Sequence, residues 1–238
     1  MQFQLKSTAN SRSSPDAMTT EKRELNPSDM VSSAVYKVIT GCVVPRPIGF
    51  VSTVSIDGIY NAAPFSFFNA ISHIPPMVCI SISPVYRTKS KKDTLQNILD
   101  TGEFVVNIVN SQLAAAQDFC SNEYPPEFDE LTASGLTAAP SSMVKAPRIH
   151  ESPANFECKL YTATPLPDSP YTLVIGKVVN MHVRGDLLLP DGRISSPKLD
   201  AIGRMAGSLY TRTTELFSLD HDAFKLIKAA DTPLDSAN

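Results

Sequence analysis

The residues best placed for chemistry form a basic run, Arg87-Thr-Lys-Ser-Lys-Lys-Asp-Thr94, at the predicted start of a helix. Cations at this end oppose the positive pole of the helix dipole, at a cost of roughly 0.3–1 kcal/mol for each exposed side chain. The free backbone N–H groups there can hold an anion together with the side-chain charges. The run therefore predicts an anion site with Asp93 or Thr94 as the helix cap. A solvated basic loop is the alternative.

A second candidate site is the stretch from Asn61 to Asn69, with the sequence NAAPFSFFN. Pro64 forces the preceding Ala63 to be extended, and two adjacent alanines would let a flat group approach the backbone. The phenylalanines would supply apolar walls, while Ser66 and the asparagines offer hydrogen bonds to the polar edge of a heteroaromatic ring. The alternative is an aromatic loop that packs in the core.

Arg46 is the third feature, because it lies between two prolines that fix its backbone. A guanidinium presented from a stiff segment suits an anionic group, or else a structural ion pair. Taken together, the three features describe a flat aromatic ligand that carries a phosphate.

Other common site patterns are absent from the sequence. It has no GxGxxG, GxxxxGK[ST] or GxSxG motif, and its four histidines are too scattered to predict a metal site. The four cysteines form no CxxC, which argues against zinc and disulfides and suits a reducing, cytoplasmic setting. The net charge of −3 gives no general attraction to nucleic acid or anionic lipid, and no apolar run reaches the ~18–20 residues that span a bilayer.

The elements that would position these residues are mostly strands. Apolar residues alternate with small or polar ones over 48–53, 78–83, 104–108 and 156–160. Residues 171–183 form a longer predicted strand, with Gly176 as a bulge. Asp57-Gly58 predicts a hairpin turn in which both residues have positive φ. Short helices are expected from Asp93 to Gly102 and over 112–120.

Together these elements predict a mainly β protein, an antiparallel barrel or sandwich. No repeat or linker divides the chain, so one domain is expected over residues 25–230. Residues 1–24 and 231–238 are polar and are predicted to be flexible tails. A transit peptide is the alternative for the first tail, but its acidic residues argue against that.

A longer set of segments carries a resemblance to a known family. Residues 43–72, VVPRPIGFVSTVSIDGIYNAAPFSFFNAIS, are followed by PPMVCISIS, KKDTLQNI and GEFVVNIV. In order, spacing and residue type this set resembles the flavin reductase-like, FMN-binding split-barrel proteins, and residues 203–217 resemble the branch that includes flavoredoxin. The resemblance implies a six-stranded antiparallel split β-barrel with a few peripheral helices, a homodimer, and FMN held near the dimer interface.

Carried over to matching positions, the resemblance also implies a flavin pocket. The first strand and its entry, the 61–66 stretch and two serines would surround the flavin, and the basic run with Thr94 would hold the phosphate. In the C-terminal motif, Arg204, Tyr210 and Arg212 could reach an active site or the partner subunit. The implied cofactor-binding residues are Arg46, Ser52, Thr53, Asn61, Ala63, Pro64, Phe65, Ser66, Ser81, Ser83, Arg87, Lys89, Lys92 and Thr94.

The function that the resemblance implies is that of an FMN-binding oxidoreductase. The first hypothesis is an NAD(P)H-linked flavin reductase that supplies reduced flavin or electrons to a partner, such as a monooxygenase. FMN would perform the hydride and electron chemistry, and the protein would bind and orient it. A non-catalytic FMN electron carrier, or an enzyme that uses FMN on an organic substrate, are the alternatives.

One departure from the family concerns the nicotinamide. Many shorter flavin reductases have an Asp-His pair just before the step that matches Ile175-Gly176, where this sequence has Pro170 and Tyr171. His182, on the same strand, could replace that histidine or could be an ordinary half-buried one. His182 and Tyr171 are therefore the candidate catalytic side chains.

Overall fold

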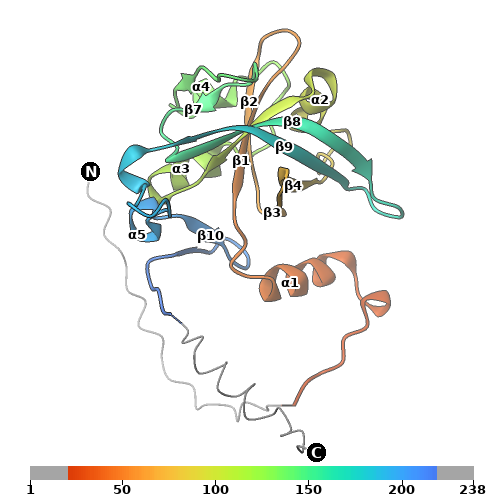
Figure 1. Cartoon of the computed structure of the whole chain (residues 1–238). Helices are drawn as coiled ribbons and strands as arrows, with labels where there is room; N and C mark the ends of the chain where they lie inside the picture. The colour runs from red at the N-terminus through yellow and green to blue at the C-terminus, as the bar shows by residue number, and fades with distance from the viewer. Residues whose placement is uncertain (1–20, 219–238) are drawn as a thin grey trace, which may run out of the picture.

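The structure, a computed structural model, describes residues 21–218. Its centre is a seven-stranded antiparallel sheet that curls into a barrel, with strand order β2-β1-β5-β8-β9-β4-β3 (Figure 1). The predicted tail 231–238, most of the predicted tail 1–24, and residues 219–230 of the predicted domain lie outside the described residues. The strands of the sheet are β1 (Gly49–Val54), β2 (Tyr60–Phe65), β3 (Phe68–His73), β4 (Pro76–Ile82), β5 (Glu103–Ile108), β8 (Ala154–Pro165) and β9 (Thr172–Val183).

Smaller elements surround this sheet. Two short hairpin-like sheets pair β6 (Ala138–Ala139) with β7 (Arg148–Ile149), and β10 (Ile202–Arg204) with β11 (Tyr210–Arg212). The α-helices are α1 (Ser32–Cys42), α2 (Asp93–Thr101), α3 (Ala114–Phe119), α4 (Glu130–Ala133) and α5 (Ser196–Leu199), and the 3-10 helices are η1 (Pro27–Asp29), η2 (Ser111–Leu113) and η3 (Gly185–Leu187).

The predicted fold class is confirmed: the protein is a mainly β, antiparallel split barrel with a few peripheral helices. The sheet has seven strands rather than six, because residues 68–73 form an edge strand on β4. The predicted helix over 93–102 is α2, which ends at Gly102 with a φ of 71°. The predicted helix over 112–120 is divided into η2 and α3.

The alternating apolar residues fill the inside of the barrel, as their period of two requires. Val78, Ile80 and Ile82 of β4 pack in one buried cluster with Phe104 and Val106 of β5. Burial of each such side chain contributes roughly 1.5–3 kcal/mol. A second cluster lies on the outer side of β1 and β2, under α3, α4, β7 and β10, so this side of the barrel is also closed.

Gly176 has a different role from the one predicted. The pairing of β8 and β9 has two irregularities: Val179 is the extra residue on β9, and Tyr161 is the extra residue on β8. Gly176 itself pairs with Leu160, so the bulge predicted at Gly176 is wrong. A Cβ atom at Gly176 would lie 2.2 Å from Cζ of Phe104. The glycine is therefore needed because the aromatic ring in the barrel core touches the backbone of β9.

The β1–β2 hairpin is confirmed, but its predicted turn type is wrong. Gly58 has a φ of 85°, whereas Asp57 is not among the residues with positive φ. The connection is longer than two residues, with Gly58 N donating to Ser55 O and Ile59 N donating to the Ser55 side chain. The Asp57-Gly58 pair thus predicted the hairpin but not the length of the connection between its two strands.

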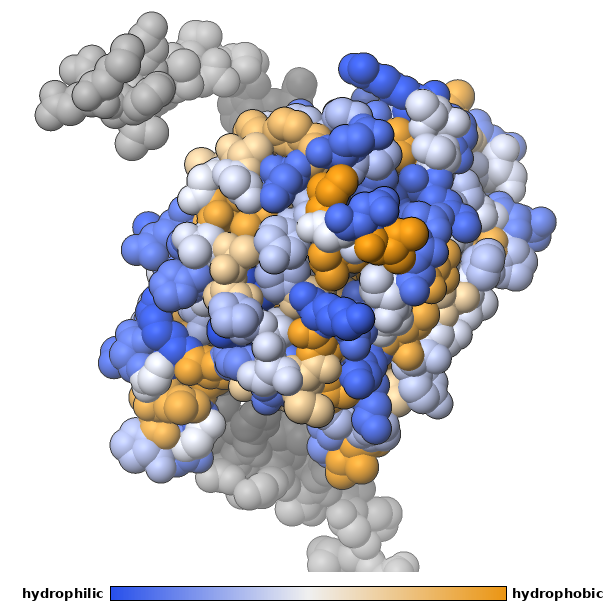
Figure 2. Space-filling model, turned by 90° about the horizontal axis from the view of Figure 1, so that it is seen from above, coloured by the Kyte–Doolittle hydropathy of each residue, from blue (hydrophilic) through white to orange (hydrophobic). Residues whose placement is uncertain are grey.

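α1 was not predicted, and it projects away from the barrel (Figure 1). It exposes large apolar side chains, among them Tyr36, Ile39 and Val38. By contrast, the face shown in Figure 2 has its apolar residues in small groups separated by polar ones. Within residues 21–218, no helix is long and apolar enough to cross a membrane.

Candidate functional site

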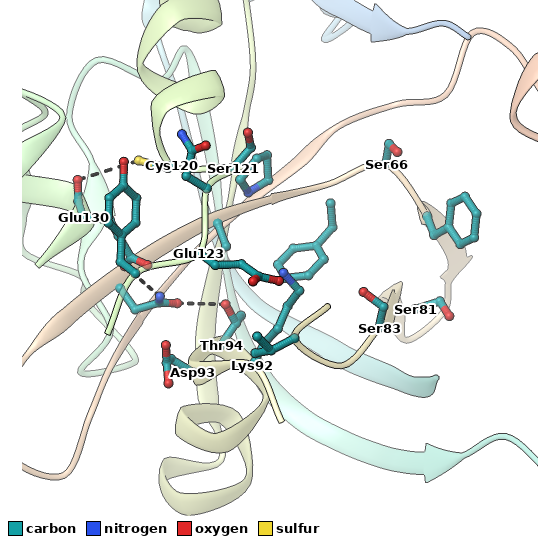
Figure 3. Close-up of a pocket in the computed structure, with 18 of the residues that line it drawn as sticks. Ser66, Ser81, Ser83, Lys92, Asp93, Thr94, Cys120, Ser121, Glu123 and Glu130 are labelled. Atoms are coloured by element: carbon teal, nitrogen blue, oxygen red, sulfur yellow. Dashed lines mark hydrogen bonds between the residues drawn. The ribbon is translucent and has the colours of Figure 1, made fainter. Parts of the chain in front are cut away.

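A pocket of about 250 Å³ opens at one end of the barrel (Figure 3). Its walls come from β2, the end of β4, the N-terminus of α2, and the segment that joins α3 to α4. Residues predicted from the sequence for the site line it together: Asn61, Ala63, Pro64, Phe65, Ser66, Phe67, Ser81, Ser83, Lys92, Thr94 and Tyr171. The structure thus brings together the two stretches that the sequence analysis treated as separate.

β2 supplies a flat wall because it is an edge strand of the sheet. Pro64 is tolerated there since an edge strand does not need every backbone N–H group for pairing. Ala63 and Pro64 are half-buried at the pocket and present little side-chain bulk. Such a wall allows a planar ligand to lie against the backbone, as the sequence predicted.

A row of hydrogen bonds crosses the floor of the pocket (Figure 3). The Thr94 hydroxyl donates to Oδ1 of Asn61 over 2.8 Å, and Nδ2 of Asn61 donates to Oε2 of Glu130 over 2.7 Å. The same carboxylate oxygen accepts the backbone N–H of Ala62 over 3.2 Å. The two donors at Glu130 fix which way the Asn61 amide is turned.

Thr53 supports this row from behind and does not line the pocket. Its hydroxyl donates to Oδ1 of Asn61 over 3.3 Å and accepts Nδ2 of Asn97 over 3.0 Å. Thr53 is fully buried. The structure therefore places it one side chain away from the ligand space that the sequence assigned to it.

The charges around the pocket are mixed. Among the described residues, Lys92 is the one cation that lines it, whereas Asp93, Glu123 and Glu130 contribute carboxyl groups. Burial raises the pKa of Glu130 to about 7, against the opposing effect of the hydrogen bonds from Ala62 and Asn61. Burial also raises the pKa of Asp93. An anionic ligand would therefore be held at the Lys92 end and away from ionised Glu130.

Most of the basic run turns away from the pocket. Arg87 and Lys89 are exposed and do not line it. Lys89 has a φ of 58°, and its ammonium group lies over the ring of Tyr86, 4.6 Å from the centroid. The Tyr86 N–H donates to Glu123 over 2.6 Å, which ties this loop to the segment between α3 and α4.

Arg46 does not line this pocket either, because its guanidinium is occupied by backbone carbonyls. It donates to the carbonyl oxygens of Thr40, Val43 and Met205 over 2.6 to 3.1 Å, and to the Ser66 hydroxyl over 3.3 Å. The side chain is buried. Of the two interpretations left open by the sequence, the structure favours a structural role, although the partners are carbonyls and not an acid.

Ser52 and His182 also lie outside the pocket. The Ser52 hydroxyl donates to Pro147 O and accepts the Asn107 amide in the buried interior. His182 is at the opposite end of β9 from Tyr171 and forms a hydrogen-bonded pair with the buried Glu157. Burial alone would raise the pKa of Glu157, but hydrogen bonds from the Ser142 N–H and His182, among others, lower it. His182 is thus a half-buried structural histidine in this chain.

The C-terminal motif packs on itself in this chain. The Arg204 guanidinium lies over the ring of Tyr210, 4.5 Å from its centroid, and the Tyr210 hydroxyl accepts a hydrogen bond from Gln117. Arg212 forms an ion pair with Asp200. None of the three predicted residues lines the pocket described here.

Several pocket residues had no signal in the sequence analysis. The missed residues are Tyr36, Val85, Asp93 as a lining group, Cys120, Ser121, Asn122, Glu123, Tyr124 and Glu130. Most come from the α3–α4 segment, which lies about sixty residues beyond β2 in the chain. Asp129 caps α4, because its side chain accepts a hydrogen bond from the backbone N–H of Thr132. This cap is a local sequence signal for a helix that begins at Glu130.

Comparison with known proteins gives the family. The model of the flavin reductase-like domain matches residues 40–197, and the chain belongs to the flavin reductase-like family. An uncharacterised protein of Aquifex aeolicus is 43% identical over 178 residues, which are 75% of this chain and 89% of that one.

Two solved structures are similar over nearly their whole length. Nitrilotriacetate monooxygenase component B from Bacillus cereus is 35% identical with a TM-score of 0.80, covering 84% of this chain and all of that one. The 2-nitrobenzoate 2-nitroreductase NbaA of Pseudomonas fluorescens is 31% identical with a TM-score of 0.75, covering 91% of this chain and all of that one. The family makes a flavin the cofactor class.

Proposed function

We propose that the protein is an FMN-dependent oxidoreductase that takes hydride from NADH or NADPH and passes reducing equivalents to a partner. The observation that carries this proposal is the junction of a flat, small-residue strand with a helix N-terminus bearing Lys92. An isoalloxazine ring and a phosphate need these two surfaces at one site. The bound FMN would supply the hydride and electron transfer.

The residues of the chain would hold the two ends of the cofactor. Ala63 and Pro64 of β2 would flank the ring, with Ser66 and Ser81 as hydrogen-bonding groups at the right of Figure 3. Lys92 would neutralise the phosphate charge at the start of α2, where the backbone N–H groups of the first turn have no helical acceptor. The fit is good at these surfaces, because Ala63 and Pro64 present little side-chain bulk on the wall of β2.

A second candidate function concerns the substrate. Tyr171 stands near the place of the family histidine, and its ring stacks on Phe67 at the pocket. An aromatic pair offers a surface for a planar organic molecule rather than a proton-transferring group. Since one neighbour is named as a 2-nitrobenzoate 2-nitroreductase, reduction of an aromatic substrate is the alternative to the supply of free reduced flavin.

The partner in the leading proposal is a monooxygenase, because another neighbour is named as a monooxygenase component B. A non-catalytic electron carrier would have the same pocket but would exchange electrons only with a protein. The four cysteines of the chain are all unpaired in the structure, which is consistent with a cytoplasmic setting.

We also propose that two copies associate to complete the site. An apolar groove next to the pocket is lined by Ile39 and Val43 of the α1 region, by Pro47, and by Phe67 and Phe68. The groove and the pocket share Ser66 and Phe67, so a second copy seated on the groove would also reach the flavin. α1 projects away from the barrel and would give the second copy an additional surface to contact (Figure 1).

The test of the function is an assay of the purified protein. The visible spectrum would show flavin bands after incubation with FMN and removal of excess ligand. Oxidation of NADH or NADPH is then followed with added FMN, with 2-nitrobenzoate, and with neither. Turnover with FMN supports the reductase, and turnover only with the nitroaromatic supports the second candidate. Bound FMN that neither nucleotide reduces would support the hypothesis of a non-catalytic electron carrier.

A further inference from the structure

The row of hydrogen bonds on the pocket floor has one direction. The hydrogen of Thr94 points to Asn61, and a hydrogen of Asn61 points to Glu130. A threonine hydroxyl has a single hydrogen. Thr94 can therefore offer only oxygen lone pairs to any other group while Glu130 is ionised.

A phosphate group needs the opposite arrangement, because its oxygens accept hydrogen bonds and carry negative charge. At the Lys92 end of the pocket it would meet the lone pairs of Thr94 and the nearby charge of Glu130. Both effects oppose binding while Glu130 is ionised, and both disappear if the carboxyl group is neutral.

We propose that Glu130 takes up a proton from solvent when a phosphate group binds at Lys92, and that this reverses the row of hydrogen bonds. The protonated carboxyl donates to Oδ1 of Asn61, whose amide turns over. Nδ2 of Asn61 then faces Thr94 and Thr53, so the hydroxyl hydrogens of both threonines, which now point to Oδ1, turn away from Asn61. The hydroxyl of Thr94 is then free to donate to the phosphate. Glu130 is in this way a positioning residue that acts through Asn61. The proposal rests on the proposed function for the identity of the ligand.

The surroundings of Glu130 make it the group that takes up the proton. Its side chain is 5% exposed and it already shares Oε2 between two donors, so water and salt screen its repulsion with an added negative charge less than they would at the surface. Titratable groups face it from α2, as Lys92 and Asp93, and from the α3–α4 segment, as Cys120, Glu123 and Asp129, which caps α4. β2 brings no charged side chain to it.

Burial raises the pKa of the Cys120 thiol to about 11, so this neighbour stays neutral and does not compete for the proton. Asp93 has a raised pKa as well, and a test has to separate it from Glu130. Since Glu130 has a pKa of about 7 in the free protein, most of it is ionised at pH 8 and able to take up a proton.

The test measures proton uptake directly by calorimetric titration of FMN into the full-length protein at pH 8. The titration is repeated in two buffers of different ionisation enthalpy. FMN itself is a dianion at this pH, because the second pKa of a phosphate ester is about 6. We expect uptake of between about half and one proton per FMN, and none with riboflavin, which lacks the phosphate.

Two variants test which residue takes up the proton. Glu130→Gln is expected to abolish the uptake and to make the FMN affinity constant from pH 7 to pH 9. The affinity of the unchanged protein falls by up to about tenfold per pH unit over that range. Asp93→Asn, a matched removal of a neighbouring charge, retains the uptake. A circular dichroism spectrum and melting curve show that each variant is folded.

The outcomes separate this inference from the function on which it rests. Failure of the unchanged protein to bind FMN would overturn the proposed function. FMN binding without proton uptake, uptake that persists in Glu130→Gln, or uptake lost in Asp93→Asn would each overturn the role of Glu130 and leave the proposed function standing.

Discussion

The ring of Tyr171 stacks on the ring of Phe67, with centroids 6.1 Å apart and an interplanar angle of 19°, and both residues line the pocket. Tyr171 precedes β9 and Phe67 precedes β3, so the pair joins two connections at the mouth of the site. Burial raises the pKa of Tyr171, so its phenol stays neutral at physiological pH.

Removal of this ring is expected to weaken the binding of FMN. Phe67 would lose the stacking partner that holds its ring at the pocket, an interaction of roughly 0.5–1.5 kcal/mol, so Tyr171→Ala should raise the dissociation constant by up to about tenfold. Tyr171→Phe keeps the stack and should change the constant little. Quenching of flavin fluorescence measures both, and an equal loss in the two variants would show that the hydroxyl matters rather than the ring.

Lys92 is expected to carry most of the charge-dependent affinity for the phosphate. A hydrogen bond to a charged group contributes about 1.5–3 kcal/mol, so Lys92→Ala should weaken FMN binding at least about tenfold. The matched control is Lys91→Ala, which removes the same charge from an exposed side chain outside the pocket. Riboflavin binding should not respond to either change.

The same titration tests the rest of the basic run. Arg87 and Lys89 are exposed and do not line the pocket, so Arg87→Ala should resemble Lys91→Ala. A loss as large as that of Lys92→Ala would show that the loop closes over the phosphate when the ligand binds, and would restore the role that the sequence predicted for Arg87.

Gly176 is expected to tolerate no side chain. A methyl group there would overlap the ring of Phe104, and overpacking of a filled core costs about 1–3 kcal/mol. Gly176→Ala should lower the free energy of unfolding by that amount in urea denaturation. Gly185→Ala is the control, since a Cβ at Gly185 meets no atom within 4 Å. Equal effects of the two changes would contradict the close contact.

Glu157 is expected to stabilise the protein only when ionised. Its pKa is lower in the folded chain than in the unfolded one, so the stabilisation is present above the ordinary glutamate pKa of about 4.3 and disappears as the pH falls through the folded value. Glu157→Gln should therefore cost about 1–3 kcal/mol at pH 7 and progressively less below about pH 4. Thermal or denaturant unfolding across this pH range measures the difference, and a cost that does not change with pH would contradict the role of the charge.

The groove beside α1 is expected to be a contact between two copies. Ile39→Glu together with Val43→Glu would bury two charges there, and the protein should then elute as a monomer in size-exclusion chromatography with light scattering. Ile56→Glu, at an exposed position of the β1–β2 connection, should leave the dimer intact. A monomeric unchanged protein would refute the association.

Much of the barrel could be predicted from the sequence because its strands have one face in the core. The alternation over 78–82 is imposed by that burial, whereas 104–107 are buried on both faces of β5. Gly102 ends α2 because it adopts a positive φ. α1 escaped prediction since it is rich in β-branched residues, which are weak helix formers, and presents apolar side chains to solvent.

The site was predictable only where its residues are neighbours in the chain. Asn61 to Ser66 and Lys92 to Thr94 are compact segments, and their residue types indicate a ring and an anion. Glu130 reaches the same floor through the fold alone, because α4 packs on the outer side of β2. The charges of the basic run could not show which lysine faces inward, since that depends on the backbone turn at Lys89.

Arg46 holds together separate segments of the chain beside the pocket. Its planar guanidinium links the end of α1, through Thr40 and Val43, to Met205 beyond β10, and a lysine ammonium could not reach these carbonyls from one point. α1 and the β10–β11 hairpin are consequently locked to each other as well as to the barrel. Because Arg46 also donates to Ser66, which lines both the groove and the pocket, a second subunit would meet a surface that is formed before it binds.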